Sequence, residues 1–346
     1  MKVRFAVVGC GHIGKKHAEL IAKHPNAELV ATIDPAYDEF NSSQVQSIHF
    51  KSLADFFKQK PAVDVVCICT PNGLHAKQAI QCLDQGHHVV IEKPIALKIA
   101  DANAILEVAT RNHRHVFPVV QNRYSSTIKW LKQLVASNAL GKLHMIQMNC
   151  FWNRDEHYYS KGSWHRTLAL DGGPLYTQFS HFIDVLNWIF GRMTNIDAKF
   201  YNFNHQHHTE FEDSGLITFE INGTAGSISY TTSVYQSNFE SSITVIAEKG
   251  TVKIGGQYMN SLEYCQIDGA EKPILDENKF VNDYGSYKGS ASNHHQVIDN
   301  VINVIKGVAK PDVGLQEGIQ VVENISSIYE QRNIEKIRLA KEKLLV

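Results

Sequence analysis

A glycine-rich turn between a strand and a helix constrains this chain most. An apolar strand ends at Val8, and the segment Gly9-Cys10-Gly11-His12-Ile13-Gly14 follows directly. We expect a helix from His12 to Lys23 and then a second apolar strand, Ala27 to Ile33, which ends at Asp34. A G-x-G-x-x-G turn in this context, with an acid about 20 residues later, predicts a dinucleotide-binding βαβ unit.

Each residue of the turn has its own physical reason. Gly9 permits the tight turn, Gly11 lets the backbone approach a pyrophosphate at the helix N-terminus, and Gly14 lets helix and strand pack closely. Asp34 is placed to accept hydrogen bonds from the adenosine ribose hydroxyls. The same carboxylate would repel a 2′-phosphate, so the sequence favours NAD over NADP.

Strands and helices alternate through the first 120 residues. Further strands are expected at residues 63–69, 87–91 and 116–120, and further helices at residues 53–59, 74–85 and 99–112. This alternation predicts an α/β fold with a parallel, doubly wound Rossmann sheet. The first domain is therefore expected to span residues 1–120 and to bind NAD.

Polar residues follow two of these strands. Thr70-Pro71-Asn72 and His75 come after one strand, and Glu92-Lys93-Pro94 ends another. Ligands of open α/β sheets bind outside the carboxyl ends of the strands. Lys93 is thus a candidate proton-transfer group beside the cofactor.

The pattern changes after residue 120. A loop rich in aromatic and cationic residues spans 153–170, and Asp171-Gly172-Gly173-Pro174 opens a helix expected to run to Phe190. Thr177, His181 and Asp184 recur at helical spacing and share a face of that helix. Strand patterns fill residues 195–266, and closing helices are expected at residues 288–306 and 315–333. A large, open, mostly antiparallel sheet is expected in this second part.

Composition excludes several classes of function. The net charge of −1 gives no electrostatic footprint for nucleic acid or for an anionic membrane. No signal peptide and no run of about 18 apolar residues is evident, so no membrane association is expected. Six cysteines without a C-x-x-C pattern suggest a reducing cytoplasm. His205, His207 and His208 fall in a segment expected to be exposed and without supporting carboxylates, so no metal is expected.

Taken together, these motifs resemble the glucose–fructose oxidoreductase / inositol dehydrogenase (Gfo/Idh/MocA) family over essentially the full length. The resemblance implies a second domain, residues 121–346, that binds substrate and forms a homodimer or homotetramer through its sheet. It also implies NAD(P)-dependent oxidation of a sugar or polyol hydroxyl, and a cis bond between Lys93 and Pro94.

A narrower resemblance points to the sugar-nucleotide branch, which includes UDP-N-acetylglucosamine and UDP-N-acetylglucosaminuronate 3-dehydrogenases. It rests on Gln121-Asn122-Arg123-Tyr124, Phe151-Trp152-Asn153-Arg154 with Tyr158-Tyr159, Asp171-Gly172-Gly173, and residues 235–256. One departure is Thr177, because many members carry Asp or Asn four residues before the histidine. A carboxylate that orients His181 is therefore not expected at that position.

Two sets of site residues follow. The cofactor-binding residues are expected to be Gly9, Gly11, His12, Ile13, Gly14, Asp34, Thr70, Pro71, Asn72, His75, Glu92, Lys93 and Gln121. The substrate-binding residues are expected to be Lys93, Arg123, Arg154, Trp164, Arg166, Thr177 and His181. The arginines suit a diphosphate or uronate, since guanidinium groups bind such anions bidentately; surface charge or structural pairing is the alternative reading of each.

Oxidation of a secondary alcohol needs a base, and Lys93 and His181 are both candidates. Histidine titrates near neutrality, whereas lysine needs burial or a neighbouring cation to lose its proton there. The sequence leaves the assignment open. It also leaves two alternatives to a UDP-sugar dehydrogenase acting at C3: a dehydrogenase for a free sugar, inositol or other polyol, and a non-catalytic NAD-binding regulator or scaffold.

Overall fold

The computed structural model describes residues 1–36, 47–276, 281–283 and 288–344. The chain divides into two compact units: residues 1–121 with 293–322, and residues 122–292 with 323–346. The expected NAD-binding domain, residues 1–120, and the expected substrate-binding and oligomerisation domain, residues 121–346, stay predictions. The division itself differs in one respect, because it places residues 293–322 with the first unit.

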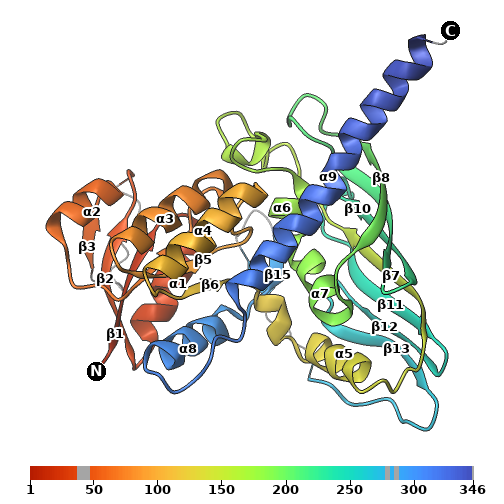
Figure 1. Cartoon of the computed structure of the whole chain (residues 1–346), viewed down its shortest axis with the longest axis horizontal. Helices are drawn as coiled ribbons and strands as arrows, with labels where there is room; N and C mark the ends of the chain where they lie inside the picture. Colours follow the sequence, from red (N-terminus) through yellow and green to blue (C-terminus); the bar gives the residue numbers. More distant parts are fainter. Residues whose placement is uncertain (37–46, 277–280, 284–287, 345–346) are drawn as a thin grey trace. The chain divides into compact units, whose positions relative to one another are not determined.

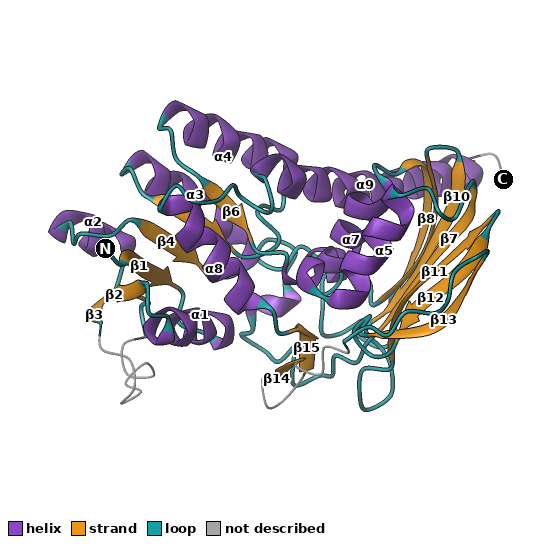
Figure 2. Cartoon of the chain, turned by 90° about the horizontal axis from the view of Figure 1, so that it is seen from below, coloured by secondary structure: helices purple, strands orange, loops and turns teal. Residues whose placement is uncertain are grey.

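The first unit is built on a six-stranded parallel sheet (Figure 1). Its strand order is β3-β2-β1-β4-β5-β6, so the order reverses between β1 and β4 and creates the topological switch point of a Rossmann fold. The strands are β1 (Val3–Val8), β2 (Ala27–Ile33), β3 (Ile48–Phe50), β4 (Val65–Ile68), β5 (His88–Ile91) and β6 (Val116–Pro118). β1, β4 and β5 read as apolar runs because helices cover both faces of the sheet, as Figure 2 shows.

This unit contains several helices, and the α-helices within its first 112 residues begin and end within one residue of the expected bounds. The helices of the unit are α1 (His12–Lys23), α2 (Leu53–Gln59), η2 (Asn72–Leu74), α3 (His75–Asp84), α4 (Ile99–Arg111), η3 (Gln121–Tyr124, whose first residue closes the unit) and α8 (His294–Ile305). The hydroxyl of Ser52 caps α2 by accepting a hydrogen bond from the Asp55 amide at 3.2 Å. α8 packs against α1, and His24, the C-cap residue of α1, lies 3.0 Å from Asp299 of α8.

Two expectations for the C-terminal segment are corrected. Residues 288–306 do not form one helix, since β15 (Lys288–Ala291) pairs with β14 (Val281–Asp283) before α8 begins. The last helix, α9 (Leu315–Leu344), extends beyond the expected end at residue 333. The residues of α8 and α1 that pack together are far apart in the sequence, so the local hydrophobic pattern does not predict this packing.

The second unit contains a seven-stranded sheet of order β13-β12-β11-β7-β10-β9-β8. Only the β7–β10 pair is parallel among its described pairs, so the sheet is mostly antiparallel as expected. The strands are β7 (Leu143–Phe151), β8 (Thr194–Tyr201), β9 (Ser214–Ile221), β10 (Thr224–Thr231), β11 (Glu240–Ala247), β12 (Gly250–Gly255) and β13 (Ser261–Ile267). Asn222 and Gly223 both have positive φ and form the hairpin turn between β9 and β10.

Helices cover one face of this sheet (Figures 1 and 2). They are α5 (Ser126–Ala136), α6 (Pro174–Thr177) and α7 (Ser180–Phe190), with a short turn, η4 (Trp164–Arg166), in the preceding loop. The helix expected at residues 174–190 is interrupted, because Phe179 adopts φ −109° and ψ 0° between α6 and α7. Thr177 and His181 therefore lie on two successive helices rather than on one.

Within the described ranges, none of the helices combines the length and the apolar character that a bilayer crossing needs.

Candidate active site

The turn between β1 and α1 has the shape that a dinucleotide requires. A methyl group on Gly14 would lie 1.8 Å from the carbonyl oxygen of Gly9, and one on Gly9 would lie 2.8 Å from the backbone of Cys69. These two positions allow the close approach of α1, β1 and β4. In contrast, no described atom lies within 4 Å of the position that a Cβ of Gly11 would occupy. The backbone at Gly11 therefore faces open space.

Gly11 is also the N-cap of α1, and no side chain makes a capping hydrogen bond there. The first amides of a helix lack partners within the helix and attract anions. Asp34, at the end of β2, accepts hydrogen bonds from the amides of Cys10 at 2.7 Å and Ala36 at 2.8 Å. The predicted contacts of the pyrophosphate with this helix N-terminus and of the ribose with Asp34 stay predictions.

His75 connects the ends of β4 and β5. Its Nδ1 lies 2.7 Å from the carbonyl oxygen of Pro94 and its Nε2 lies 2.7 Å from that of Thr70. Burial lowers the pKa of His75, while the two carbonyls oppose that shift. The Thr70 hydroxyl donates to Gln78 at 2.5 Å, and Asn72 is buried. The ring of His75 is thus occupied by protein contacts, and its predicted contact with the cofactor stays a prediction.

Glu92 is directed into the interior of the first unit. Its Oε1 lies 2.9 Å from Nε2 of His17 and 3.6 Å from Nε2 of His294, which belong to α1 and α8. All three side chains are buried. Burial would raise the pKa of the Glu92 carboxyl, but hydrogen bonds from His17 and His294 hold it well below its usual range. Contact of Glu92 with the cofactor, as expected from its place in the motif, stays a prediction.

The group formed by His17, Glu92 and His294 was not predicted from the sequence. One ligand atom from each of His17, Glu92 and His294 lies within 4.8 Å of the other two, which is compact enough for a shared metal ion. The 2.9 Å hydrogen bond between His17 and Glu92 accounts for their contact without an ion. The available signal was a histidine among Gly14, Ala18 and Ile21 on the buried side of α1.

Lys93 follows β5 and is half-buried, and its bond to Pro94 is cis, as expected. The amide of Lys93 donates to Oε2 of Glu92 at 3.3 Å. Gln121 is buried at the end of the segment after β6, and its carbonyl oxygen accepts a hydrogen bond from Asn293 at 3.2 Å. Lys93 thus lies at the carboxyl edge of the parallel sheet, where ligands of such sheets bind.

In the second unit, Thr177 is hydrogen-bonded to a carboxylate that the sequence did not connect with it. Its hydroxyl donates to Oδ1 of Asp171 at 2.6 Å, and Asp171 is fully buried. Oδ2 of Asp171 lies 3.6 Å from Nδ1 of His165, which is 3.0 Å from the Tyr158 hydroxyl. An acid therefore does lie beside residue 177, although it comes from the loop before α6.

His181 is buried near the start of α7. Asp184, one turn further on, forms a bidentate ion pair with Arg123, whose Nε and Nη2 donate to its two carboxylate oxygens at 2.8 and 2.7 Å. Both partners are buried, and the Arg123 guanidinium also lies over the Trp188 ring. This bidentate pair matches the structural reading of Arg123, while its predicted contact with substrate stays a prediction.

The remaining cationic candidates differ in exposure. Arg154 is buried, lies over the rings of Trp152 and Tyr158, and donates to Asn153 and Asn238. Trp164 and Arg166 are half-exposed in η4. Of the three arginines, Arg166 is the most accessible to a ligand.

The expected exposure of the histidine-rich segment is wrong for one residue. His205 is buried against Tyr159, and its amide donates to Asp213 and Asn202. His207 is exposed, and His208 is half-exposed 3.5 Å from Glu156. Asp213 accepts several backbone amides and draws this turn inward. The exposed-loop reading failed because it took no account of that buried acceptor.

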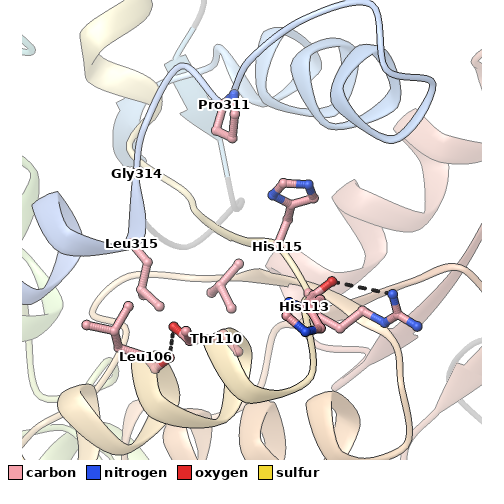
Figure 3. Close-up of a pocket in the computed structure, with 10 residues that line it drawn as sticks. Leu106, Thr110, His113, His115, Pro311, Gly314 and Leu315 are labelled. Carbon is pink, nitrogen blue, oxygen red and sulfur yellow. Dashed lines mark hydrogen bonds between the residues drawn. The ribbon is translucent and has the colours of Figure 1, made fainter.

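A cavity of about 440 Å³ lies elsewhere in the first unit (Figure 3). Its walls come from the end of α4, the segment leading into β6 and the connection between α8 and α9; Figure 3 labels Leu106, Thr110, His113, His115, Pro311, Gly314 and Leu315. His115 directly precedes β6. The cavity is therefore at the amino end of this strand, opposite the edge at which Lys93 lies.

Two family models match the chain. Residues 3–119 match the model described as an oxidoreductase family with an NAD-binding Rossmann fold, and residues 128–253 match the GFO/IDH/MocA C-terminal domain.

Individual relatives agree with these matches. The crystal structure of the WlbA dehydrogenase from Bordetella pertussis, in complex with NADH and UDP-GlcNAcA, is 32% identical with a TM-score of 0.85 and covers 96% of each chain. The 2,7-anhydro-N-acetylneuraminate hydratase of Escherichia coli K12 is 25% identical over 55% of this chain and 50% of its own length. The myo-inositol 2-dehydrogenase of Thermotoga maritima is 28% identical over 42% of this chain and 44% of its own. The match thus spans about half the length of these curated relatives.

Proposed function

Because this chain belongs to the Gfo/Idh/MocA oxidoreductase family and carries an NAD-binding Rossmann domain, we propose that it oxidises a secondary hydroxyl of a sugar. The proposed substrate is a UDP-N-acetylhexosamine or its uronate, and the proposed position is C3. The observation that carries this choice is the 32% identity, over 96% of both chains, to a dehydrogenase bound to NADH and UDP-GlcNAcA.

The chemistry divides between cofactor and protein. Oxidation removes a hydride from the carbon and a proton from its hydroxyl, and bound NAD⁺ supplies the hydride acceptor. The α1 N-terminus and Asp34 bind and orient the cofactor in this proposal. Lys93 and His181 are the proposed proton-handling residues, one as base and the other as hydrogen-bond partner of the same hydroxyl.

The protonation state of Lys93 decides how it can act. A lysine that serves as a base must be neutral near pH 7, which requires its pKa to fall from about 10.4. The Glu92 carboxylate would oppose that fall by stabilising the ammonium. However, its carboxylate is directed into the interior, where it is hydrogen-bonded to His17 at 2.9 Å and lies 3.6 Å from His294. This placement favours Lys93 as a functional base.

Recognition of the substrate's anionic groups is assigned to cationic side chains. A diphosphate or uronate needs cationic or amide donors, and Arg166 is half-exposed whereas Arg123 and Arg154 are buried in protein contacts. We therefore assign Arg166 the first place among the arginines for substrate recognition. Trp164 is half-exposed beside it and offers an aromatic face to a sugar or uracil ring.

A polyol dehydrogenase is the second candidate, favoured by the 28% identity to a myo-inositol 2-dehydrogenase over part of both chains. The test is NADH formation from NAD⁺ with UDP-N-acetylhexosamines, their uronates, free sugars and inositols. Turnover confined to UDP-sugars supports the first proposal, and turnover of a polyol with none of any UDP-sugar refutes it. Absence of turnover on the whole panel, with NADH binding intact, would favour a non-catalytic role.

The two proton-handling residues are tested one at a time. Lys93→Met and His181→Gln should each lower kcat by about 100-fold or more, since a general base contributes about 10²–10⁴-fold. NADH affinity is the control measurement in both variants. If both retain near-wild-type kcat on the true substrate, the proposed site is wrong. If activity falls in both, the kcat–pH profile assigns the base. The fall of kcat at low pH should persist in the variant that still carries the base and disappear in the variant that lacks it.

A further inference from the structure

The residues on both sides of Lys93 are held by buried histidines from three helices. On one side, the Glu92 carboxylate contacts His17 of α1 at 2.9 Å and His294 of α8 at 3.6 Å. On the other side, the Pro94 carbonyl lies 2.7 Å from Nδ1 of His75, which opens α3. All of these residues belong to the first unit.

The contacts anchor the backbone of Lys93 as well as its neighbours. Oε2 of Glu92 accepts the Lys93 amide at 3.3 Å, while Oε1 faces the two histidines. The second nitrogen of His75 lies 2.7 Å from the carbonyl oxygen of Thr70, so the ring lies between the Lys93 segment and the end of β4, and its neutral form donates to one of the two carbonyls. The three histidines are at most 1% exposed.

Burial makes this arrangement costly to break. A buried carboxylate without partners loses its hydration and gains nothing in return. The Glu92 side chain therefore remains between α1 and α8, and the histidine that contacts it on α1, His17, lies three residues, or less than one helical turn, after Gly14 of the glycine turn. One network thus connects the cofactor-binding helix with the strand end that carries the lysine.

We propose that His17, His75 and His294, acting through Glu92 and the Pro94 carbonyl, are positioning residues that hold Lys93 in its reactive place. We call these three side chains the histidine clamp. The inference rests on the proposed function of Lys93, and it assigns to the three histidines no contact with the reacting atoms. A small displacement of a catalytic group can lower a rate by about 100-fold, so a clamp of this kind has a measurable effect on kcat.

The first test needs no substrate. Amide hydrogen exchange, read by mass spectrometry, is compared for the peptide that spans residues 89–97 in the wild type, Glu92→Gln, His294→Gln and His75→Gln. We expect exchange in this peptide to be about tenfold faster in each variant, with peptides of the second unit unchanged. The control is His24→Gln, because His24 pairs with Asp299 at 3.0 Å across the same two helices but does not contact Glu92.

The second test separates positioning from general structural support. Once a substrate turns over, each clamp variant is combined with Lys93→Met. A residue that acts through Lys93 lowers kcat by about 100-fold alone and has little further effect when Lys93 is already absent. A residue with a merely structural role lowers activity by the same factor in both backgrounds. In His294→Gln, which changes a residue outside both sets of expected site residues, the KM for NAD⁺ and the NADH affinity should stay within a few-fold of wild type.

Several results would overturn the clamp. Unchanged exchange in residues 89–97 would do so, as would equal effects of His24→Gln and His294→Gln, or additive losses with Lys93→Met. A divalent metal that copurifies at one equivalent and is lost in Glu92→Gln would replace the clamp by a metal centre. If His294→Gln does not fold, the isosteric Glu92→Gln carries the test. If no substrate is turned over but amide exchange in residues 89–97 is faster in the variants, the proposed function is refuted. The inference that the histidines anchor the Lys93 segment would still stand.

Discussion

Gly11 and Gly14 occupy the same turn but differ in what a methyl group would meet. At Gly11 the added carbon would face open space, at a backbone φ of −67° that alanine adopts freely. At Gly14 it would lie 1.8 Å from the Gly9 carbonyl, so the packing of α1 on β1 would have to change. A methyl group would therefore disturb the fold at Gly14 but not at Gly11, and we propose that a ligand is what requires Gly11.

This difference gives a prediction with an internal control. Gly14→Ala should lower the free energy of unfolding by about 2 kcal/mol or more, as overpacking of a tight contact does. Gly11→Ala should leave that free energy near the wild-type value and weaken NADH binding by about tenfold or more, because the methyl group occupies the space of the pyrophosphate. Urea denaturation and fluorescence titration with NADH measure the two effects. Wild-type NADH affinity in Gly11→Ala would show that the pyrophosphate binds elsewhere.

Residue types that act through local geometry could be identified from sequence, and those that act through distant partners could not. The glycine turn, Asp34 and Lys93 are candidates that the sequence alone supplies, because their spacing relative to the strands predicts where they lie. His17 is 75 residues from Glu92, and His294 comes from a segment beyond the second sheet. Nothing in local periodicity connects these positions. The link between Thr177 and Asp171 was missed for a different reason, since the hydroxyl reaches back across the turn before α6.

At the scale of elements, periodicity located helices well and interruptions poorly. α1 and α2 have the expected bounds, because an apolar stripe and a clear terminus define each. No glycine or proline lies at the break between α6 and α7, and Phe179 is buried there between the buried polar residues Gln178 and Ser180. Such a break depends on tertiary packing. The apolar periodicity of residues 174–190 contains no sign of it and therefore predicts one continuous helix.

Helix α8 carries a titratable group whose pKa makes the docking of the helix depend on pH. Burial lowers the pKa of His294 to about 4, although Glu92 opposes the shift. The unfolded histidine titrates near 6.5, so the unfolded chain binds more protons between these values. The stability associated with neutral His294 is therefore complete above about pH 6.5 and is lost as the pH falls toward 4. Glu92 acts in the same direction, since its pKa is depressed in the folded state.

We expect this contribution to reach about 2 kcal/mol between pH 5 and pH 7.5. His294→Gln should therefore flatten the increase in the free energy of unfolding across that interval by about this amount. His24→Gln is the matched control, because its pair with Asp299 joins the same helices at a partly exposed site. Urea denaturation at several pH values gives the comparison. An equally steep pH dependence in wild type and His294→Gln would contradict the assignment.

At the scale of the whole molecule, the chain returns to its first unit after building the second. Residues 293–322 contribute α8 and the start of α9 to the Rossmann unit, while residues 323–346 belong with the second. A linear reading places a boundary at residue 120 and assigns everything after it to one domain. The alternation of strands and helices specifies the parallel sheet, but it does not specify which later helix covers that sheet.

The face of the second sheet opposite its helices presents apolar side chains on four strands. Met145, Leu216, Ile246 and Tyr264 are 47%, 53%, 41% and 47% exposed, and the strand registers place them on one face. Exposed apolar surface of this extent on a broad sheet is typical of an interface. We propose that a second copy of this chain covers it, as the expected homodimer or homotetramer requires.

Leu216→Glu and Ile246→Glu should each shift the protein toward monomer, because a glutamate buried in such an interface would lack a partner. Both side chains point away from the core of the unit, so NADH binding and the melting temperature of the monomer should change little. Val308→Glu is the control, since Val308 is 73% exposed in the connection between α8 and α9, outside this sheet. Sedimentation velocity across a dilution series measures the state of association. A monomeric wild type, or a dissociation constant unchanged by both glutamates, would place the contact surface elsewhere; a shift with Val308→Glu alone would move it to the first unit.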